Sequence, residues 1–229
     1  ASFCRKYIGG AGFIAYYLLR EVRSGIDALG PENKLIFAAG PLTGIPLGGC
    51  ARHTVGAKSP LTGGIAKSEV GEHWGAQFKR AGFDALIIEG RSDRPVYLWI
   101  HNGKVEIKDG AHLWGMNTKE TQETIRSELA DTKIRAAMIG PGGENMVKYA
   151  CLMHGPFDAA GRGGMGAVMG SKNLKAVAVR GDKMPSAADK DGVKKMVDWR
   201  KAIKELYKAF SVFGTGTAMA RFEQLGNLP

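Results

Sequence analysis

The chain has 229 residues, of which 44% are hydrophobic and 24% are charged, which is the composition of an ordinary globular protein with enough apolar surface for a core. Its net charge of +10 is spread along the chain, which argues against nucleic acid and favours a solvated surface or a small anionic ligand. Cys4, Cys50 and Cys151 are too far apart for a disulfide, zinc or iron–sulfur motif, and neither a membrane span nor a signal peptide is visible, so we expect a cytoplasmic protein.

The first part of the chain predicts two helices and a strand between them. Apolar residues recur at helical spacing over residues 13–22, and the glycines before them fit a close-packed helix start better than an anion-binding turn. The apolar residues 34–39, which follow a turn, predict a strand. Apolar residues three and four positions apart over residues 65–81 predict the second helix.

Two groups of polar residues in this part could bind a ligand. Arg52 and Lys58 flank a strand-like alternation, and they are either a basic wall facing an anion or a surface-facing strand edge. Glu69, Glu72 and His73 fall within one turn of the second predicted helix, where a carboxylate and a histidine could bind a divalent ion or transfer a proton. A lone helical histidine is more often a surface or core residue, so we favour that interpretation.

The middle of the chain alternates between strands and turns. Asn102 and Gly103 predict a tight hairpin turn, and Asn117 with Glu120 predicts a capping box at the start of a helix. The predicted strands are residues 85–89, 96–100, 104–107, 135–139 and 147–153.

A glycine-rich stretch, residues 159–172, precedes an apolar strand-like segment at 174–179. Glycine lets a backbone turn tightly and approach a ligand closely. A short helix beginning at about Gly163 would turn its free N–H groups and its positive dipole end towards an anion, and Arg162 would add a bidentate donor. The stretch therefore predicts a phosphate cradle.

The composition changes after Gly181. A linker over residues 182–188 leads to an amphipathic helical pattern, which we expect to pack on a core rather than to bind a membrane or nucleic acid. We therefore expect an N-terminal domain at residues 1–182, with its first strands missing, and the start of a helical domain at residues 183–229. Because the chain starts without Met and ends abruptly, we expect a fragment of a longer protein.

Four motifs stand in order along the chain, at residues 31–44 (PENKLIFAAGPLTG), 58–63 (KSPLTG), 140–145 (GPGGEN) and 159–176 (AAGRGGMGAVMGSKNLKA). Together they resemble those of the aldehyde ferredoxin oxidoreductase family. The resemblance runs from residue 7 to residue 181 and implies an α+β domain of two related β-sheets with flanking helices. In that family this domain is a base on which a pterin cofactor sits, and a mostly α-helical domain follows.

The resemblance also implies an activity and its cofactors. These are tungsten, or occasionally molybdenum, held by two pyranopterins, a Mg²⁺ ion bridging the pterin phosphates, and a [4Fe–4S] cluster. The implied reaction oxidises an aldehyde to a carboxylic acid and passes the electrons to ferredoxin or another electron-transfer protein. The implied assembly is a homodimer or one with additional subunits. The family's cluster cysteines and catalytic residues lie in later domains, so we expect no catalytic residue here.

The resemblance places cofactor-binding residues at five positions, which are Arg52, Gly71, Ala159, Gly161 and Arg162. Arg52 is expected to contact a pterin phosphate, and Gly71 stands at the predicted helix start on the other side. The carbonyl oxygen of Ala159 is a candidate Mg²⁺ ligand.

Two residues depart from the best-known members of the family. Glu69 replaces an asparagine and would offer Mg²⁺ a harder, negatively charged oxygen. Asp158 replaces an arginine, which removes a phosphate-binding cation and adds repulsion.

Two rival functions remain open. One is the tungsten subunit of a related enzyme such as a benzoyl-CoA reductase, which the residues present here do not distinguish from an aldehyde oxidoreductase. The other is a non-catalytic module that binds a phosphorylated ligand or a partner protein through its basic loops. A cluster motif encoded beyond Pro229 would favour an enzyme.

Overall fold

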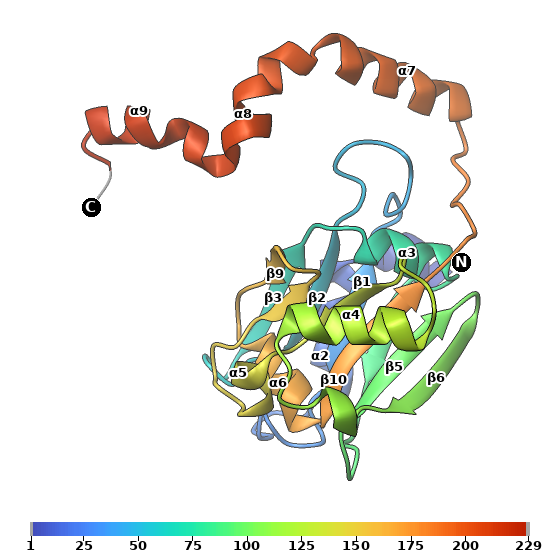
Figure 1. The fold of residues 1–229 in the computed structure, drawn as a ribbon, viewed down its shortest axis with the longest axis vertical. Coiled ribbons are helices and arrows are strands. Elements are labelled where there is room, and N and C mark those ends of the chain that lie inside the picture. The colour runs from blue at the N-terminus through green and yellow to red at the C-terminus, as the bar shows by residue number, and fades with distance from the viewer. Residues whose placement is uncertain (1, 228–229) are drawn as a thin grey trace. The chain divides into compact units, whose positions relative to one another are not determined.

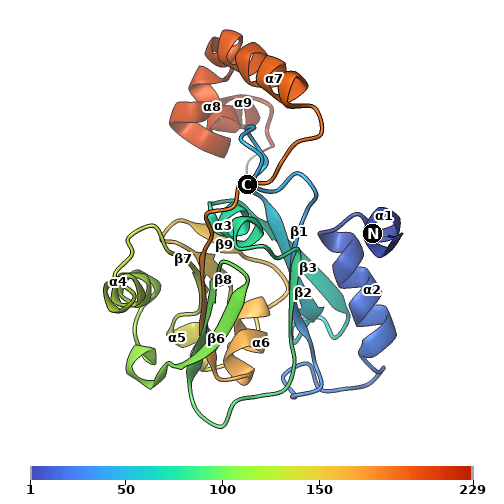
Figure 2. The same cartoon turned by 90° about the vertical axis from the view of Figure 1, so that its right-hand side faces the viewer.

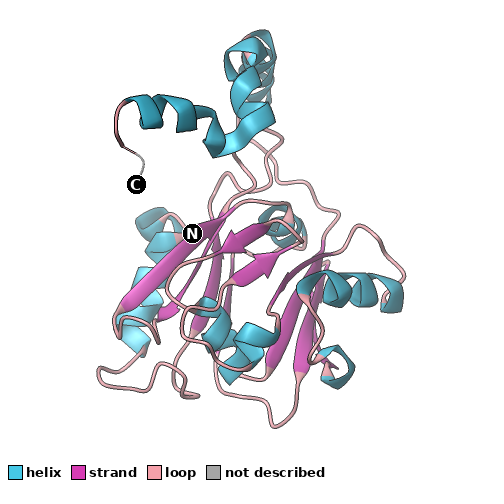
Figure 3. Ribbon diagram, turned by 60° about the vertical axis from the view of Figure 1, so that its left-hand side comes forward, coloured by secondary structure: helices cyan, strands magenta, loops and turns pink. Residues whose placement is uncertain are grey.

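The computed structural model describes residues 2–227, which fall into two compact units (Figure 1). One unit comprises the residues up to 45 together with 49–185, and the other comprises 46–48 and the residues from 186 onward. The first unit contains two β-sheets with flanking helices, as predicted. Figure 3 shows the two sheets as separate groups of strands with helices on their outer sides.

The first sheet is antiparallel, with the strand order β3-β2-β1-β4. Its inner strand β1 is buried on both faces. Helix α2 covers one face, and the core between the two sheets covers the other. Gly56 in β2 permits the close packing of α2, since a Cβ atom there would lie 2.5 Å from Cγ2 of Ile14. The bounds are β1 (Leu35–Ala39), β2 (His53–Lys58), β3 (Ile65–Val70), β4 (Ala85–Ile88), α1 (Ser2–Tyr7) and α2 (Ala11–Glu21).

The second sheet is mixed, with the order β6-β5-β10-β7-β8-β9. Strand β10 is parallel to β5 and antiparallel to β7. In Figure 2, α4 and α2 lie on opposite outer sides of the unit, with both sheets between them. The strands are β5 (Val96–His101), β6 (Lys104–Asp109), β7 (Arg135–Met138), β8 (Leu152–His154), β9 (Asp158–Ala160) and β10 (Leu174–Arg180).

Two short helices contribute to the core between the sheets, α3 through Trp74 and Phe78 and α6 through Met165, Val168 and Met169. Helices η1, α4 and α5 lie at the second sheet, whereas α2 covers the first. The bounds are α3 (Trp74–Arg80), η1 (Ala111–Leu113), α4 (Thr118–Glu128), α5 (Pro141–Glu144) and α6 (Met165–Ser171).

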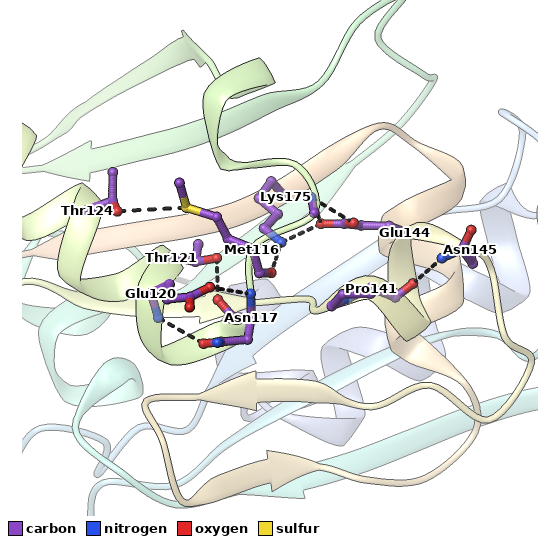
Figure 4. A network of polar contacts seen from close by, with 10 residues as sticks. Met116, Asn117, Glu120, Thr121, Thr124, Pro141, Glu144, Asn145 and Lys175 are labelled. Atoms are coloured by element: carbon purple, nitrogen blue, oxygen red, sulfur yellow. Dashed lines mark hydrogen bonds and ion pairs between the residues drawn. The ribbon is translucent and has the colours of Figure 1, made fainter.

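A buried ion pair connects strand β10 of the second sheet with helix α5 and with the segment that precedes α4 (Figure 4). Lys175 of β10 is fully buried and pairs with Glu144 at the end of α5, whose side chain is 5% exposed. The Lys175 ammonium also donates to the carbonyl of Met116 at 2.8 Å, and both carboxylate oxygens of Glu144 accept from the N–H of Gly115. The pair therefore fixes α5 against β10 and the segment that leads into α4.

The local predictions of turns and caps are confirmed. Asn102 and Gly103 both have positive φ, 42° and 85°, in the turn between β5 and β6. The capping box is complete, because the N–H of Glu120 donates to the Asn117 side chain and the Glu120 carboxylate accepts from the Asn117 N–H.

The helix predicted at residues 65–81 is wrong in its first half. Residues 65–70 form β3, and helix α3 begins only at Trp74. Ala66, Ser68 and Val70 face inward while Lys67 and Glu69 are exposed, which is the period of two of a strand. The alternation is weak in the sequence because the inward-facing Ala66 and Ser68 are small and not strongly apolar. The strand predicted at 147–153 is also shorter, since β8 begins at Leu152.

The second unit consists of short helices. The side chain of Asp189 caps α7 by accepting from the N–H of Gly192 at 2.7 Å, so the first part of the predicted amphipathic helix forms. The pattern extends to Phe210 in the sequence, but α7 ends at Ala202 and a 3-10 turn follows it. Its predicted packing is not seen within the described residues, where Met196 and Trp199 are 50% and 58% exposed. No helix within residues 2–227 has the length and hydropathy to cross a bilayer. The bounds are α7 (Lys190–Ala202), η2 (Lys204–Tyr207), α8 (Lys208–Phe213), η3 (Gly214–Ala218) and α9 (Met219–Gln224).

Candidate cofactor site

The candidate site lies where edge strands of the two sheets meet, since β3 and β9 contact each other (Figure 1). We call Arg52, β3 and Gly71 the first wall, and β9 with residues 161–164 the second wall. A Cβ atom at Gly71 would lie 3.3 Å from the Asp158 carboxylate, and one at Gly163 would lie 2.6 Å from Cβ of Ala66. These two glycines therefore permit the close approach of the walls.

The first wall carries exposed charges. Lys67 and Glu69 form an ion pair at 2.5 Å, with both side chains about half exposed. The Lys67 ammonium lowers the pKa of Glu69, and the charge of Arg52 adds to this effect. The carbonyl of Arg52 accepts from the Thr43 hydroxyl at 2.8 Å, which anchors its backbone while its side chain stays exposed. The charge of Arg52 thus acts on Glu69, which places the two side chains on the same wall.

The backbone of Glu69 faces the outer edge of the first sheet. The N–H of Ser59 donates to the carbonyl of Gly64, so these two residues form a hydrogen-bonded pair. In antiparallel strands such pairs alternate with non-hydrogen-bonded pairs. The register of β2 with β3 therefore makes Thr54 and Glu69 a non-hydrogen-bonded pair, and the Glu69 carbonyl points away from β2.

The same alternation applies to Ala159. The N–H of Gly155 donates to the carbonyl of Ala136, so the backbone groups of Met153 point to β7 and those of His154 point to β9. Ala159 is opposite Met153 in β9, and its carbonyl therefore points away from β8. The Ala159 carbonyl, which the resemblance connects with Mg²⁺, and the Glu69 carbonyl thus lie on the outer edges of neighbouring edge strands. For Glu69 the sequence predicts the carboxylate as the ligand, and the strand register adds its carbonyl as a second oxygen.

The glycine-rich stretch is only partly the predicted cradle. Helix α6 begins at Met165, and Gly164 at its N-cap has a left-handed conformation with φ 73°. The first turn is buried, and the N–H of Gly166 donates to the carbonyl of Ala150, so this helix end faces the core rather than an anion. The exposed part is Gly161 and Arg162, and a Cβ atom at Gly161 would meet no atom within 4 Å.

Two lysines of the motifs have structural roles. The ammonium of Lys172 is buried and donates to the carbonyls of Asn33 at 2.6 Å and Gly90 at 2.9 Å, and its burial lowers its pKa to about 8. Lys58 donates to the carbonyl of Ile26 at 2.7 Å. Of the two residues predicted to form a basic wall, Arg52 alone has its side chain at the site.

The predicted cluster of Glu69, Glu72 and His73 does not form a helical turn. Glu69 is in β3, whereas Glu72 follows it in a loop, with φ 62°. The Glu72 carboxylate accepts from the N–H of Trp74 at 2.7 Å and lies 3.5 Å from Nε of Arg135. Within residues 2–227, no three His, Cys, Asp or Glu side chains are grouped to hold a metal ion. A cation at this site would therefore depend on carbonyls and on its ligand.

Asp158 lies at the junction of the site and a cleft. Its carboxylate is next to Gly71, and it lines a cleft of about 490 Å³ together with Glu72, Arg126 and Arg135. The negative charge expected from this departure is thus present on the second wall.

A buried pair of histidines behind the two walls was not predicted. Nε2 of His53 lies 3.0 Å from Nε2 of His154, and the rings pack against Trp74. Burial and the neighbouring His154 hold the pKa of His53 well below its ordinary value, and burial lowers that of His154 to about 3. Both rings are therefore neutral near pH 7. Residues 101 positions apart carry no local sequence signal of their contact.

The donor set suits a ligand with two phosphate groups and a hard cation between them. Exposed guanidinium groups at Arg52 and Arg162 provide planar donors for phosphate on the two walls. The outward carbonyls of Glu69 and Ala159 are the oxygen ligands that Mg²⁺ prefers. The residues present thus fit the phosphate–magnesium part of the cofactor.

Comparison with known proteins identifies the family. The model for the aldehyde ferredoxin oxidoreductase N-terminal domain matches residues 1–181. The chain is 50% identical over 209 residues to a tungsten-containing aldehyde ferredoxin oxidoreductase of Pyrococcus abyssi and 40% identical over 230 residues to the WOR-like subunit of an aliphatic sulfonate oxidoreductase of Pyrococcus furiosus. These alignments cover 90% and 93% of this chain but 34% and 36% of the relatives, so the chain spans about a third of their length.

A solved structure has the same fold. The chain superposes with a TM-score of 0.84 and 42% identity on the active site complex BamBC of benzoyl coenzyme A reductase, over 89% of this chain and 32% of that one. Together with the family match, the two sheets and the order of the motifs, this likeness shows that the chain belongs to the aldehyde ferredoxin oxidoreductase family of oxidoreductases.

Proposed function

We propose that this chain is the pterin-binding base of a tungsten-dependent enzyme that oxidises an aldehyde to a carboxylic acid. The electrons pass through a [4Fe–4S] cluster to ferredoxin. The observation that carries the proposal is the meeting of two edge strands with outward carbonyls at Glu69 and Ala159, together with an exposed arginine on each wall, Arg52 on the first and Arg162 on the second. The relatives named tungsten-containing aldehyde ferredoxin oxidoreductases support the metal, the substrate class and the electron acceptor.

Each residue of the site has a defined task in this proposal. Arg52 and Arg162 would bind the phosphates of the pterin cofactor, and the carbonyls of Glu69 and Ala159 would hold Mg²⁺. Gly71 and Gly161 leave room for the ligand to approach the backbone. When bound, the tungsten, or molybdenum, with its pterins supplies the redox chemistry, and this chain supplies binding and orientation.

The acidic residues Glu69 and Asp158 change the charge of the site but do not prevent phosphate binding. The Glu69 carboxylate is already paired with Lys67, so its charge is partly compensated when a phosphate approaches. Asp158 has no such partner among the described residues and repels a phosphate on the second wall. Binding on that side therefore depends on Arg162 and on the cation.

Cofactor analysis of the native protein tests the proposal. We expect about two pterins per tungsten, since the family resemblance implies two pyranopterins for each metal ion. Arg52→Ala and Arg162→Glu should lower the tungsten and pterin content without unfolding the protein, because both side chains are exposed. Arg94→Ala is the control, since this arginine is 75% exposed and pairs only with Asp109 among the described residues. Native protein without tungsten and pterin, or both site variants with unchanged content, would contradict the proposal.

A second function deserves a direct test because of the likeness to the BamBC complex. In this alternative the chain belongs to the tungsten subunit of a complex that acts on an aromatic thioester of coenzyme A. Acceptor reduction that depends on an aldehyde would support the oxidoreductase, and turnover of benzoyl coenzyme A would support the alternative. The mass of the native assembly separates a homodimer from a complex with additional subunits. For either enzyme we propose a cytoplasmic location.

A further inference from the structure

The histidine pair connects the two sheets by a direct hydrogen bond. His53 is the first residue of β2 in the first sheet, and His154 is the last residue of β8 in the second. Their Nε2 atoms are 3.0 Å apart, and the two residues are 2% and 0% exposed. One ring donates and the other accepts, so the bond holds strands of different sheets at a defined distance.

Each histidine adjoins a residue of the candidate site. His53 follows Arg52 in the chain and is paired with Val70, the residue before Gly71. His154 is paired with Asp158, the residue before Ala159. The hydrogen bond therefore joins the first wall to the second from behind, where solvent does not compete for it.

Packing alone does not account for these two residues. They lie in a core that also contains Phe37, Trp74 and Phe78, where a pair of apolar side chains would carry no desolvation cost. Nδ1 of His53 has no hydrogen-bond partner among the described residues, which adds to the cost of burying the pair. Unlike two apolar side chains, the histidine pair forms a hydrogen bond of defined length and direction.

We propose that His53 and His154 are positioning residues that set the separation of the two walls. The separation of β2 and β8 determines the distance from Arg52 to Arg162 and from the Glu69 carbonyl to the Ala159 carbonyl. The pair thereby matches the walls to a ligand that carries two phosphates and a cation. This inference rests on the proposed function of the site.

Leucine substitutions in the native protein separate positioning from packing. His53→Leu and His154→Leu each leave one imidazole buried without its partner, so both the melting temperature and the cofactor content should fall. The double variant has no such orphaned ring and should regain most of the lost melting temperature. Its tungsten and pterin content should stay about tenfold below wild type, as when the outer hydrogen bonds of a metal site are removed.

Two further variants complete the test. In His154→Gln the amide reaches the position of Nε2 and keeps the bond to His53, so cofactor content should stay close to wild type, even if the leucine variants do not fold. Tyr97→Phe removes a partly buried side-chain hydrogen bond, the one to Glu128 at 2.7 Å, on the face of the second sheet that packs on α4. Its cofactor content should not change.

The outcomes distinguish this inference from the proposed function. If the double variant regains cofactor content together with its melting temperature, or if His154→Gln loses cofactor as His154→Leu does, the histidines are core residues and the inference fails. Wild-type protein with tungsten and pterin would leave the proposed function intact in that case. Wild-type protein without either would overturn both.

Discussion

Lys172 and Arg162 are the two basic residues of the same glycine-rich stretch, yet the fold gives them different surroundings. The Lys172 ammonium is enclosed by backbone carbonyls, whereas Arg162 is exposed beside β9. The sequence predicts a phosphate cradle for this stretch, from its glycines, the start of a short helix and the Arg162 guanidinium, and it does not show which basic side chains are exposed. Burial is what separates a structural cation from one that can meet a ligand, and burial depends on the contacts with Asn33 and Gly90, which are distant in the chain.

The two buried histidines predict a dependence of stability on pH. In the unfolded chain an imidazole binds a proton near pH 6.5, whereas the folded protein keeps the pKa of His154 at about 3 and that of His53 well below its ordinary value. Below pH 6.5 the unfolded state therefore binds more protons, and the free energy of unfolding falls as the pH decreases. We expect a loss of about 1.4 kcal/mol per pH unit for each histidine.

Denaturant unfolding between pH 7 and pH 5 measures this loss. The variant with both histidines replaced by leucine serves as the control, since it lacks these groups but keeps every other titrating side chain. Wild type and this variant with parallel pH profiles would show that the histidines are not neutral in the folded protein.

At the scale of elements, α5 shows how a short helix is held by a buried charge pair. Four residues are too few to form a stable helix by themselves. Glu144 at its end reaches Lys175 of β10 and the N–H of Gly115, which attaches α5 to the second sheet (Figure 4). Gly143 packs against α6, since a Cβ atom at Gly170 would lie 1.9 Å from the carbonyl oxygen of Gly143. The ion pair thus supports the helix that follows the second wall.

Glu144→Ala should destabilise the protein by about 3–5 kcal/mol, because it leaves the Lys175 ammonium buried without a counter-charge. The double variant Glu144→Leu with Lys175→Met should lose less than Glu144→Ala, since neither charge remains. Asp131→Ala, which breaks the more exposed pair with Arg180, is the matched control, with a loss of about 1 kcal/mol or less. Urea unfolding compares the three, and equal losses in Glu144→Ala and Asp131→Ala would contradict the role of burial.

At the scale of the whole molecule, the first unit brings the edges of two sheets together, and glycines determine how closely they approach. Gly163 touches the first wall at Ala66, whereas Gly161 lies beside it in open space. The space available for a side chain therefore differs between these two glycines, although one residue separates them. Packing between the sheets restricts Gly163, whereas only a ligand restricts Gly161.

Gly163→Ala should destabilise the protein by about 1–3 kcal/mol, because its φ is +76° and its Cβ atom would collide with Ala66. Gly161→Ala should change stability by less than about 0.5 kcal/mol, as for a surface substitution. It should nevertheless reduce the pterin content of the native protein if the cofactor approaches this backbone. Thermal unfolding and pterin fluorescence of the two variants give the comparison, and a Gly161→Ala protein with full pterin content would show that no ligand contacts this position.

The sequence by itself determined the Asn102–Gly103 turn, the capping box at Asn117 and most strands, because those signals lie within a few adjacent residues. Its four motifs also identified the family, and the two-sheet fold followed from that resemblance. Only the tertiary structure decided that residues 65–70 form an edge strand, that the start of α6 is buried and that His53 meets His154. These features depend on burial and on pairing between residues far apart in the chain, and neither is encoded in a local pattern. The candidate site combines both kinds of information, because its motifs are local and the meeting of its walls is not.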